Sequence, residues 1–123
     1  MPKRGDIYWA DIPEAVGHEQ QGDRPWLIVS ADFIPNQYDI VIAIPLTSRH
    51  KANQQHRIGI PDSEKIDEPG TKGWKGYSVA LTEQIRILDM SRFGLNPVKV
   101  GHVKSLGMNM VDAGILYVLG IPP

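Results

Sequence analysis

The stretch GHEQQGDRPWLIV at residues 17–29 joins a polar, glycine-bounded loop to an apolar run. The apolar run predicts a buried strand over residues 26–30. Pro25 fixes the backbone where this strand begins and favours an extended conformation for Arg24. An arginine beside an apolar run is costly unless its N–H donors meet an anionic partner. The stretch therefore predicts a strand edge at which Arg24 can bind a phosphate.

The residues on either side of this stretch predict further short strands. The most apolar run, residues 40–44, is expected to be a central strand, with a bend or bulge at Pro45. Alternating or β-rich segments predict strands over residues 5–12, 56–60 and 78–88. Proline, glycine and polar residues predict connections over residues 13–23, 31–39 and 61–76.

The C-terminal part of the chain predicts a helix instead. From Ser105 onward, apolar residues recur at steps of three and four, as on the buried face of an amphipathic helix. Gly120 can end that helix in a left-handed conformation, and Pro122 cannot continue it. Short strands followed by one terminal helix predict a mainly β (α+β) fold, built as a small, strongly curved antiparallel sheet or partial barrel. We expect a single domain over residues 1–123.

Composition restricts the functional classes. The net charge of −1 argues against a general electrostatic nucleic-acid binder, so any contact with nucleic acid is expected to be local. The absence of cysteine excludes disulfides and thiolate metal sites and fits a reducing cytoplasm. No apolar run approaches the ~20 residues of a membrane helix, and residues 1–6 lack the apolar core of a signal peptide. We therefore expect a cytoplasmic protein without membrane contact.

Several kinds of catalysis have no matching motif. The histidines stand at positions 18, 50, 56 and 102 without metal-ligand spacing, and the acidic residues are scattered. The chain has no Walker loop, no G-x-G-x-x-G and no G-x-S-x-G elbow. The sequence thus predicts neither a metal site nor a cofactor, and His50, His56 and His102 are expected to be structural or solvated.

The remaining candidates are polar residues at strand ends. Arg24 opens the strand at 26–30, and Thr47, Ser48 and Arg49 close the apolar strand. On the expected strand at 78–88, Gln84 and Arg86 would share one face. If these ends converge, guanidinium and hydroxyl groups form a pocket that suits a phosphodiester. RNA is the fitting substrate because its 2′-hydroxyl supplies the nucleophile.

Four motifs in order along the chain resemble those of the MazF/PemK toxins. They are RGDIYWAD at 4–11, GHEQQGDRP at 17–25, IPLTS at 44–48 and VALTEQIRILD at 79–89. The resemblance implies an SH3-like small β-barrel of the MazF/CcdB type with a C-terminal helix. It also implies the toxin of a type II toxin–antitoxin system, a homodimer that a MazE/PemI-like antitoxin inhibits.

The same resemblance implies an activity and the residues that carry it. The activity is metal-independent, sequence-specific cleavage of single-stranded RNA or mRNA to 2′,3′-cyclic phosphate and 5′-hydroxyl ends. The family's catalytic arginine and threonine correspond to Arg24 and Thr47. The residues expected to bind RNA are His18, Glu19, Gln20, Ser48, Arg49, Gln84 and Arg86.

Two other functions stay open beside this one. A CcdB-like gyrase poison would act by protein binding through a C-terminal Trp-Gly-Ile, but residues 119–123 read LGIPP and no tryptophan follows Trp74. A non-catalytic barrel that binds RNA or a protein would not need both Arg24 and Thr47. Trp74 itself, between Lys72 and Lys75, is expected either to stack on a base or to cover a core edge or a dimer surface.

Overall fold

The structure is a computed structural model that describes residues 1–13, 16–19, 22–48 and 54–122. These residues form an eight-stranded antiparallel sheet in the order β4-β6-β3-β2-β1-β8-β5, with β7 paired to β3 outside that path. The strands are β1 (Asp6–Ile12), β2 (Gly22–Ile28), β3 (Ile40–Thr47), β4 (Arg57–Gly59), β5 (Lys65–Asp67), β6 (Val79–Leu81), β7 (Arg86–Asp89) and β8 (Lys99–Val103). The helices are α1 (Phe33–Tyr38) and α2 (Ser105–Val118), and the 3₁₀ turns are η1 (Asp62–Glu64), η2 (Thr82–Gln84) and η3 (Met90–Phe93).

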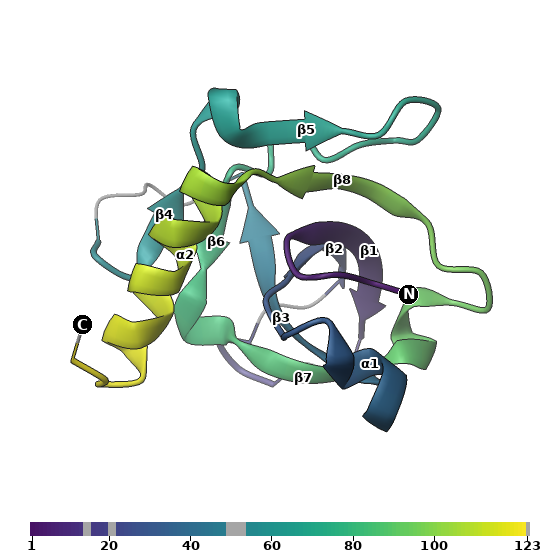
Figure 1. Ribbon diagram of the computed structural model, residues 1–123, viewed down its shortest axis with the longest axis horizontal. Helices are drawn as coiled ribbons and strands as arrows, with labels where there is room; N and C mark the ends of the chain where they lie inside the picture. The colour runs from purple at the N-terminus through teal and green to yellow at the C-terminus, as the bar shows by residue number, and fades with distance from the viewer. Residues whose placement is uncertain (14–15, 20–21, 49–53, 123) are drawn as a thin grey trace.

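The sheet is strongly curved, and α2 lies beside β4 and η2 (Figure 1). The expected curved antiparallel sheet with a C-terminal helix is therefore confirmed. Helix α2 ends as its sequence predicted, since Gly120 adopts a φ of 70° and its N–H bonds to the Tyr117 carbonyl. Neither described α-helix has the length and apolar content needed to span a membrane.

Strand β3 is the central strand, as its apolar sequence predicted. It pairs with β2 along one edge, and along the other with β7 through residues 40–43 and then with β6 through residues 46 and 47. Pro45 lies between the segment of β3 that pairs with β7 and the segment that pairs with β6. The strand tolerates the missing N–H of proline at such a break in pairing. Strand β3 has no bulge against β2 at Pro45, because it keeps one register with β2 through Pro45 and continues to Thr47.

Alternate residues of the strands face two hydrophobic clusters. In β2, Leu27 packs in a cluster with Trp74 and Val111, whereas Trp26 packs in a second cluster with Leu88. Successive side chains of a strand point to opposite faces, so β2 and β3 separate these two clusters. Helix α2 covers the first cluster through Val111.

Three segments hold structure that the sequence pattern did not indicate. Helix α1 lies within the expected connection at 31–39, and η1 and β5 lie within the one at 61–76. Strand β2 begins at Gly22, four residues before the expected strand at 26–30. These elements are short or begin in polar sequence, and β5 forms because β8, distant in the chain, pairs with it. Local periodicity carries no signal for such pairing.

The single strand expected over residues 78–88 is also wrong. Turn η2 separates β6 from β7, and the Ile85 N–H bonds to the Thr82 carbonyl at 3.2 Å. The buried Thr82 hydroxyl donates to the backbone carbonyl of His56, which anchors the turn against β4. A buried hydroxyl needs such a partner, so Thr82 favours the turn over an unbroken strand.

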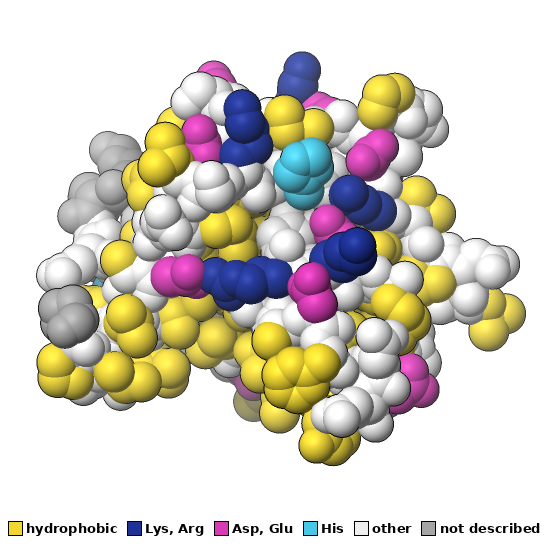
Figure 2. Space-filling model, viewed as in Figure 1, with side chains coloured by type: hydrophobic (Ala, Val, Ile, Leu, Met, Phe, Trp, Pro, Cys, Tyr) yellow, Lys and Arg dark blue, Asp and Glu magenta, His cyan; other side chains and the backbone are white. Residues whose placement is uncertain are grey.

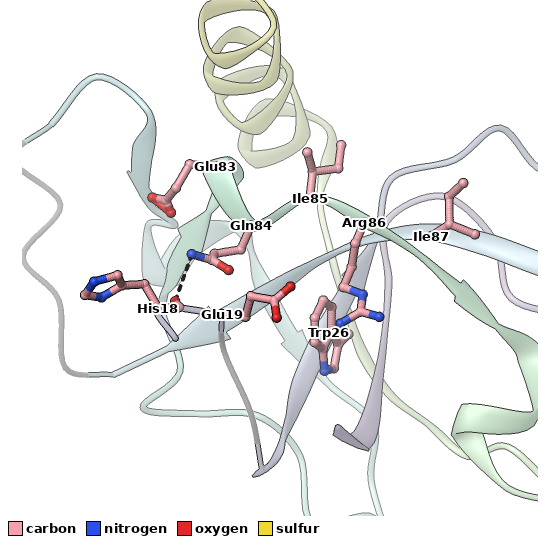
Figure 3. A pocket seen from close by; sticks show the side chains of 8 residues that line it. All are labelled: His18, Glu19, Trp26, Glu83, Gln84, Ile85, Arg86 and Ile87. Atoms are coloured by element: carbon pink, nitrogen blue, oxygen red, sulfur yellow. Dashed lines mark hydrogen bonds between the residues drawn. The ribbon is translucent and has the colours of Figure 1, made fainter. Parts of the chain in front are cut away.

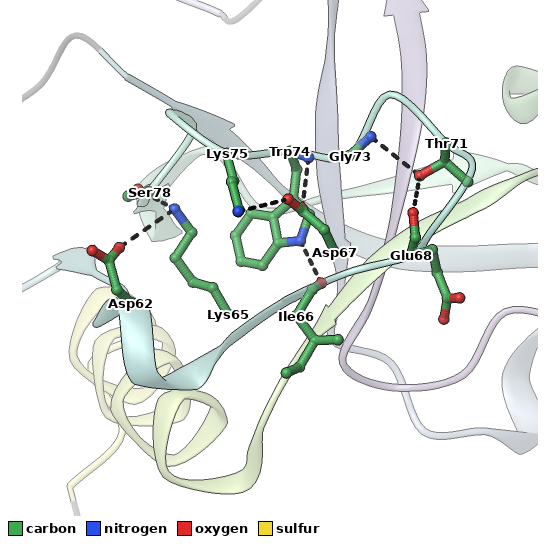
Figure 4. A network of polar contacts seen from close by, with 10 residues as sticks. All are labelled: Asp62, Lys65, Ile66, Asp67, Glu68, Thr71, Gly73, Trp74, Lys75 and Ser78. Carbon is green, nitrogen blue, oxygen red and sulfur yellow. Dashed lines mark hydrogen bonds and ion pairs between the residues drawn. The ribbon is translucent and has the colours of Figure 1, made fainter.

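Trp74 closes the core at the edge where β5 meets β8. It is 1% exposed, its indole N–H donates to the Ile66 carbonyl at 2.8 Å, and its backbone N–H donates to Asp67 at 3.0 Å. The Lys65 ammonium lies 5.0 Å from the ring centroid and donates to Ser78 (Figure 4). Trp74 is thus a core residue, which confirms the core interpretation and leaves no ring face for a base.

Part of the surface is apolar. Figure 2 shows hydrophobic side chains gathered at the lower left, over the C-terminal part of α2. Leu119 is 55% exposed, and Ile87 on β7 is 60% exposed. A groove beside Leu119 is lined by Ile42, Ile85 and Leu116 among others.

Gly101→Ala should destabilise the fold. A Cβ at Gly101 would lie 2.2 Å from the Ile66 carbonyl oxygen and 2.3 Å from the Trp74 indole nitrogen. Overpacking of this kind typically costs about 1–3 kcal/mol. We expect a clearly lower Tm in thermal unfolding, with the exposed Lys104→Ala as control. An unchanged Tm would show that Trp74 does not pack against β8 in this way.

Candidate functional site

Arg24 and Thr47 lie opposite each other on neighbouring strands. Strands β2 and β3 pair Trp26 with Pro45 and Leu27 with Ile44, and the same register two residues further sets Arg24 opposite Thr47. Opposite residues of an antiparallel pair project from the same face. The Arg24 guanidinium donates a long hydrogen bond, 3.4 Å, to the Leu46 carbonyl next to Thr47. The arginine and threonine of two separate motifs thus meet at one strand end.

Burial differs between these residues. Thr47 is 4% exposed, Arg24 is half-buried and Ser48, the next residue after β3, is exposed. A half-buried guanidinium is only partly hydrated, which strengthens its attraction for an anion. Ser48 stands at the rim of the site, where it can reach a larger ligand.

The loop after β1 folds back over the neighbouring turn. The Glu19 carboxylate accepts the Val16 N–H at 2.6 Å, and the Gln84 amide donates to the His18 carbonyl at 3.3 Å. These bonds fix the described part of the loop, residues 16–19, against η2. His18 and Glu19 are thereby held beside the start of β7.

A groove of about 570 Å³ separates this loop from η2 and β7. It is lined by His18, Glu19, Trp26, Glu83, Gln84, Ile85, Arg86 and Ile87 (Figure 3). Four of the residues expected to bind RNA therefore line one groove. Arg24, Thr47 and Ser48 are not among its lining residues, and Gln20 and Arg49 lie outside the described residues.

Gln84 and Arg86 reach the groove by a different route from the expected one. They do not alternate along one strand, because Gln84 ends η2 and Arg86 begins β7. Arg86 pairs with Ala43 on β3. The turn and the strand end thus bring both side chains to the groove.

Glu83 is a groove residue that the sequence reasoning missed. Its Oε1 accepts from the Arg57 Nε at 2.8 Å and lies 3.5 Å from the His56 Nε2. Its Oε2 is buried and has no hydrogen-bond partner among the described residues. His56 in turn stacks on Tyr117 of α2 with a 12° angle between the ring planes. The pairing joins β4 to η2, and no local pattern indicates it.

Trp26 is the second residue that the sequence reasoning missed. The residue is 1% exposed and forms the floor of the groove. Its indole N–H is buried without an acceptor among the described residues. Its place directly after Arg24 and Pro25 was a usable signal, since alternation sets Trp26 and Arg24 on the same face of β2.

Charges in the groove are of both signs. Figure 3 shows the Glu19 carboxylate and the Arg86 guanidinium pointing toward one another above Trp26. Arg86 is half-buried, and its guanidinium makes no hydrogen bond or ion pair with the described residues. In that part of the chain, no three His, Asp or Glu side chains converge to form a metal-binding group.

Comparison with known proteins identifies the family. Residues 3–119 match the model of the PemK-like, MazF-like toxins of type II toxin–antitoxin systems. The chain is 33% identical to endoribonuclease EndoA of Bacillus subtilis over 119 residues, 97% of this chain and 95% of that protein. It is also 33% identical to endoribonuclease MazF of Staphylococcus saprophyticus over 123 residues, 98% of this chain and 93% of that protein.

Solved structures agree in fold. MazF from Deinococcus radiodurans superposes with a TM-score of 0.75 at 25% identity, covering 98% of this chain and 97% of that one. A mycobacterial endoribonuclease, solved with its cognate antitoxin, gives a TM-score of 0.73 at 24% identity over 100% of this chain and 99% of that one. The chain therefore belongs to the PemK-like, MazF-like toxin family of type II toxin–antitoxin systems.

Proposed function

We propose that this protein is a toxin that cleaves single-stranded RNA, including mRNA, at specific sequences without a metal ion. The observation that carries the proposal is that Arg24 and Thr47 lie at one end of the paired strands β2 and β3, where the Arg24 guanidinium donates to the Leu46 carbonyl next to Thr47. The similar EndoA and MazF proteins are endoribonucleases by name, which supports the same reaction class here. Because mRNA is its proposed substrate, we expect the protein to act in the cytoplasm.

The proposed reaction uses the nucleophile that RNA carries. The 2′-oxygen attacks the adjacent phosphorus, the 2′-hydroxyl loses its proton, and the bond from phosphorus to the 5′-oxygen breaks as that oxygen gains a proton. The products are a 2′,3′-cyclic phosphate and a 5′-hydroxyl end. Arg24 neutralises the charge that develops on the phosphorane and assists proton transfer, and the Thr47 hydroxyl donates to the same oxyanion.

The two alternative functions are less well supported. A gyrase poison of the CcdB type would need a binding group that residues 119–123 lack, and the family match covers residues 3–119 as a MazF-like toxin. A non-catalytic barrel would not require a half-buried arginine opposite a buried threonine hydroxyl.

Two partners follow from the proposed function. We expect a homodimer, because the exposed apolar surface around Ile87 and Leu119 is energetically unfavourable in water and a second copy can cover it. We also expect a MazE/PemI-like antitoxin, since the mycobacterial endoribonuclease is solved with its cognate antitoxin and a MazF from Deinococcus radiodurans is solved with MazE. An acidic segment would suit Arg24 and Arg86, because carboxylates bind where phosphates do.

Cleavage should persist in EDTA and should require ribose. The proposed chemistry takes its nucleophile from the RNA and its charge stabilisation from Arg24. Purified protein in excess EDTA should therefore cut single-stranded RNA within a few-fold of its untreated rate, and DNA of the same sequence should survive. Loss of activity in EDTA with rescue by Mg²⁺, or cleavage of the DNA, would contradict the mechanism.

Substitution of Arg24 or Thr47 should reduce cleavage without unfolding the protein. Loss of one donor to a transition-state oxyanion typically costs about 10²–10³ in rate, so we expect that loss for Arg24→Ala and a smaller one for Thr47→Val. Arg24→Lys should recover only part of the cleavage rate, because an ammonium cannot hold two phosphate oxygens in a planar fork. Wild-type rates with unchanged melting curves would show that these residues are not the active site.

The antitoxin should compete with RNA. An acidic segment bound by Arg24 and Arg86 occupies the phosphate sites, and added salt weakens such charge pairing. We expect antitoxin to lower RNA binding in proportion to its occupancy, and Arg24→Ala and Arg86→Ala to bind it less tightly. RNA binding that survives saturating antitoxin would refute the shared site.

A further inference from the structure

The groove above Trp26 suits a phosphate less well than the strand end at Arg24 and Thr47 does. Its lining carries two carboxylates, Glu19 and Glu83, beside the single guanidinium of Arg86. Although Arg57 offsets Glu83 at 2.8 Å, a phosphate in the groove would still face the Glu19 carboxylate. The scissile phosphate belongs instead at Arg24 and Thr47, which lie outside the groove lining.

Opposed charges above an apolar floor suit a neutral, planar group with both donors and acceptors. Glu19 offers an acceptor that the Val16 N–H holds in position. Arg86 offers guanidinium donors that no described residue uses. Ile85 and Ile87 add apolar lining, and Trp26 closes the floor. A nucleobase next to the scissile phosphate matches this combination.

We propose that this groove is a nucleobase pocket that reads guanine, an assignment that rests on the proposed RNA cleavage. A carboxylate can accept two adjacent donors, and guanine presents N1–H and the N2 amino group side by side on its Watson–Crick edge. Its neighbouring O6, and N7 beyond it, are the acceptors that arginine most often contacts. Glu19 therefore binds the two donors and Arg86 binds O6.

The other bases match the acceptor of Glu19 and the donors of Arg86 less well. Adenine has no carbonyl oxygen for Arg86, and uracil offers the carboxylate one N–H. Cytosine offers its N4 amino group to Glu19 but has its carbonyl oxygen at the far end of the same edge. The buried indole N–H of Trp26, which lacks an acceptor among the described residues, adds positive potential to the floor and favours a carbonyl beside Arg86.

The first experiment maps the cut sites. Purified protein digests a pool of transcripts, and the 5′-hydroxyl ends are sequenced. We expect guanine at one fixed position within about two nucleotides of the cut. If no RNA is cut, the proposed nuclease function itself fails. If RNA is cut with no fixed guanine, or with a fixed cytosine, the nuclease stands and the guanine pocket is wrong.

The second experiment measures binding apart from catalysis. An oligonucleotide with the mapped sequence carries a 2′-deoxy sugar at the cut, which removes the nucleophile, and has guanine, inosine or adenine at the read position. Inosine lacks only the N2 amino group, so we expect about tenfold weaker binding than for guanine, and a larger loss for adenine.

Substitutions of Glu19 and of Arg86 test separately which atoms of guanine each side chain binds. Glu19→Gln should bring the guanine-to-inosine ratio close to 1, because the amide replaces one of the two acceptor oxygens that face guanine N1–H and N2 by an NH2 donor. Arg86→Gln should keep that ratio but reduce the preference of inosine over adenine, since inosine retains O6. Lys75→Gln, whose side chain is 87% exposed and lies outside the groove, should change neither. A guanine-to-inosine ratio near 1 in the wild type, or one unchanged in Glu19→Gln, would overturn the proposal.

Discussion

The pairing of β2 with β3 in a single register is the constraint on which the site depends. A slip of one residue would send Arg24 and Thr47 to opposite faces of the sheet. The slip is opposed because Leu27 and Trp26 pack in different hydrophobic clusters on the two sides of β2. Burial of alternate apolar side chains on both faces of β2 therefore fixes the position of Arg24, which is not itself a core residue.

Local pairing of charges reconciles RNA cleavage with a net charge of −1. Several cations serve the fold: Arg57 binds Glu83, and Lys65 lies over Trp74 beside Ser78. Arg86 faces the groove without a partner among the described residues. Contact with RNA then depends on a few directed groups and less on the field of the whole protein, which suits selective cleavage better than general binding.

The sequence predicted the elements whose signal is local. The apolar run of β3 and the spacing of Met108, Val111 and Ile115 on α2 need no knowledge of distant residues. The sequence did not predict helix α1, strand β5 and turn η2, because they are short and depend on partners elsewhere in the chain. The site divides in the same way: its motif residues were found, whereas Glu83 and Trp26 depend on the groove that η2 creates.

A double-mutant cycle on Arg24 and Thr47 shows whether the two side chains act on the same phosphate. If both side chains act on one phosphate, single-turnover kcat/KM on a mapped RNA should show strong coupling. We expect that adding Thr47→Val to Arg24→Ala lowers kcat/KM by no more than a few-fold beyond Arg24→Ala alone, with Lys75→Gln as an additive control. A loss in the double variant equal to the product of the two single losses would contradict a shared site.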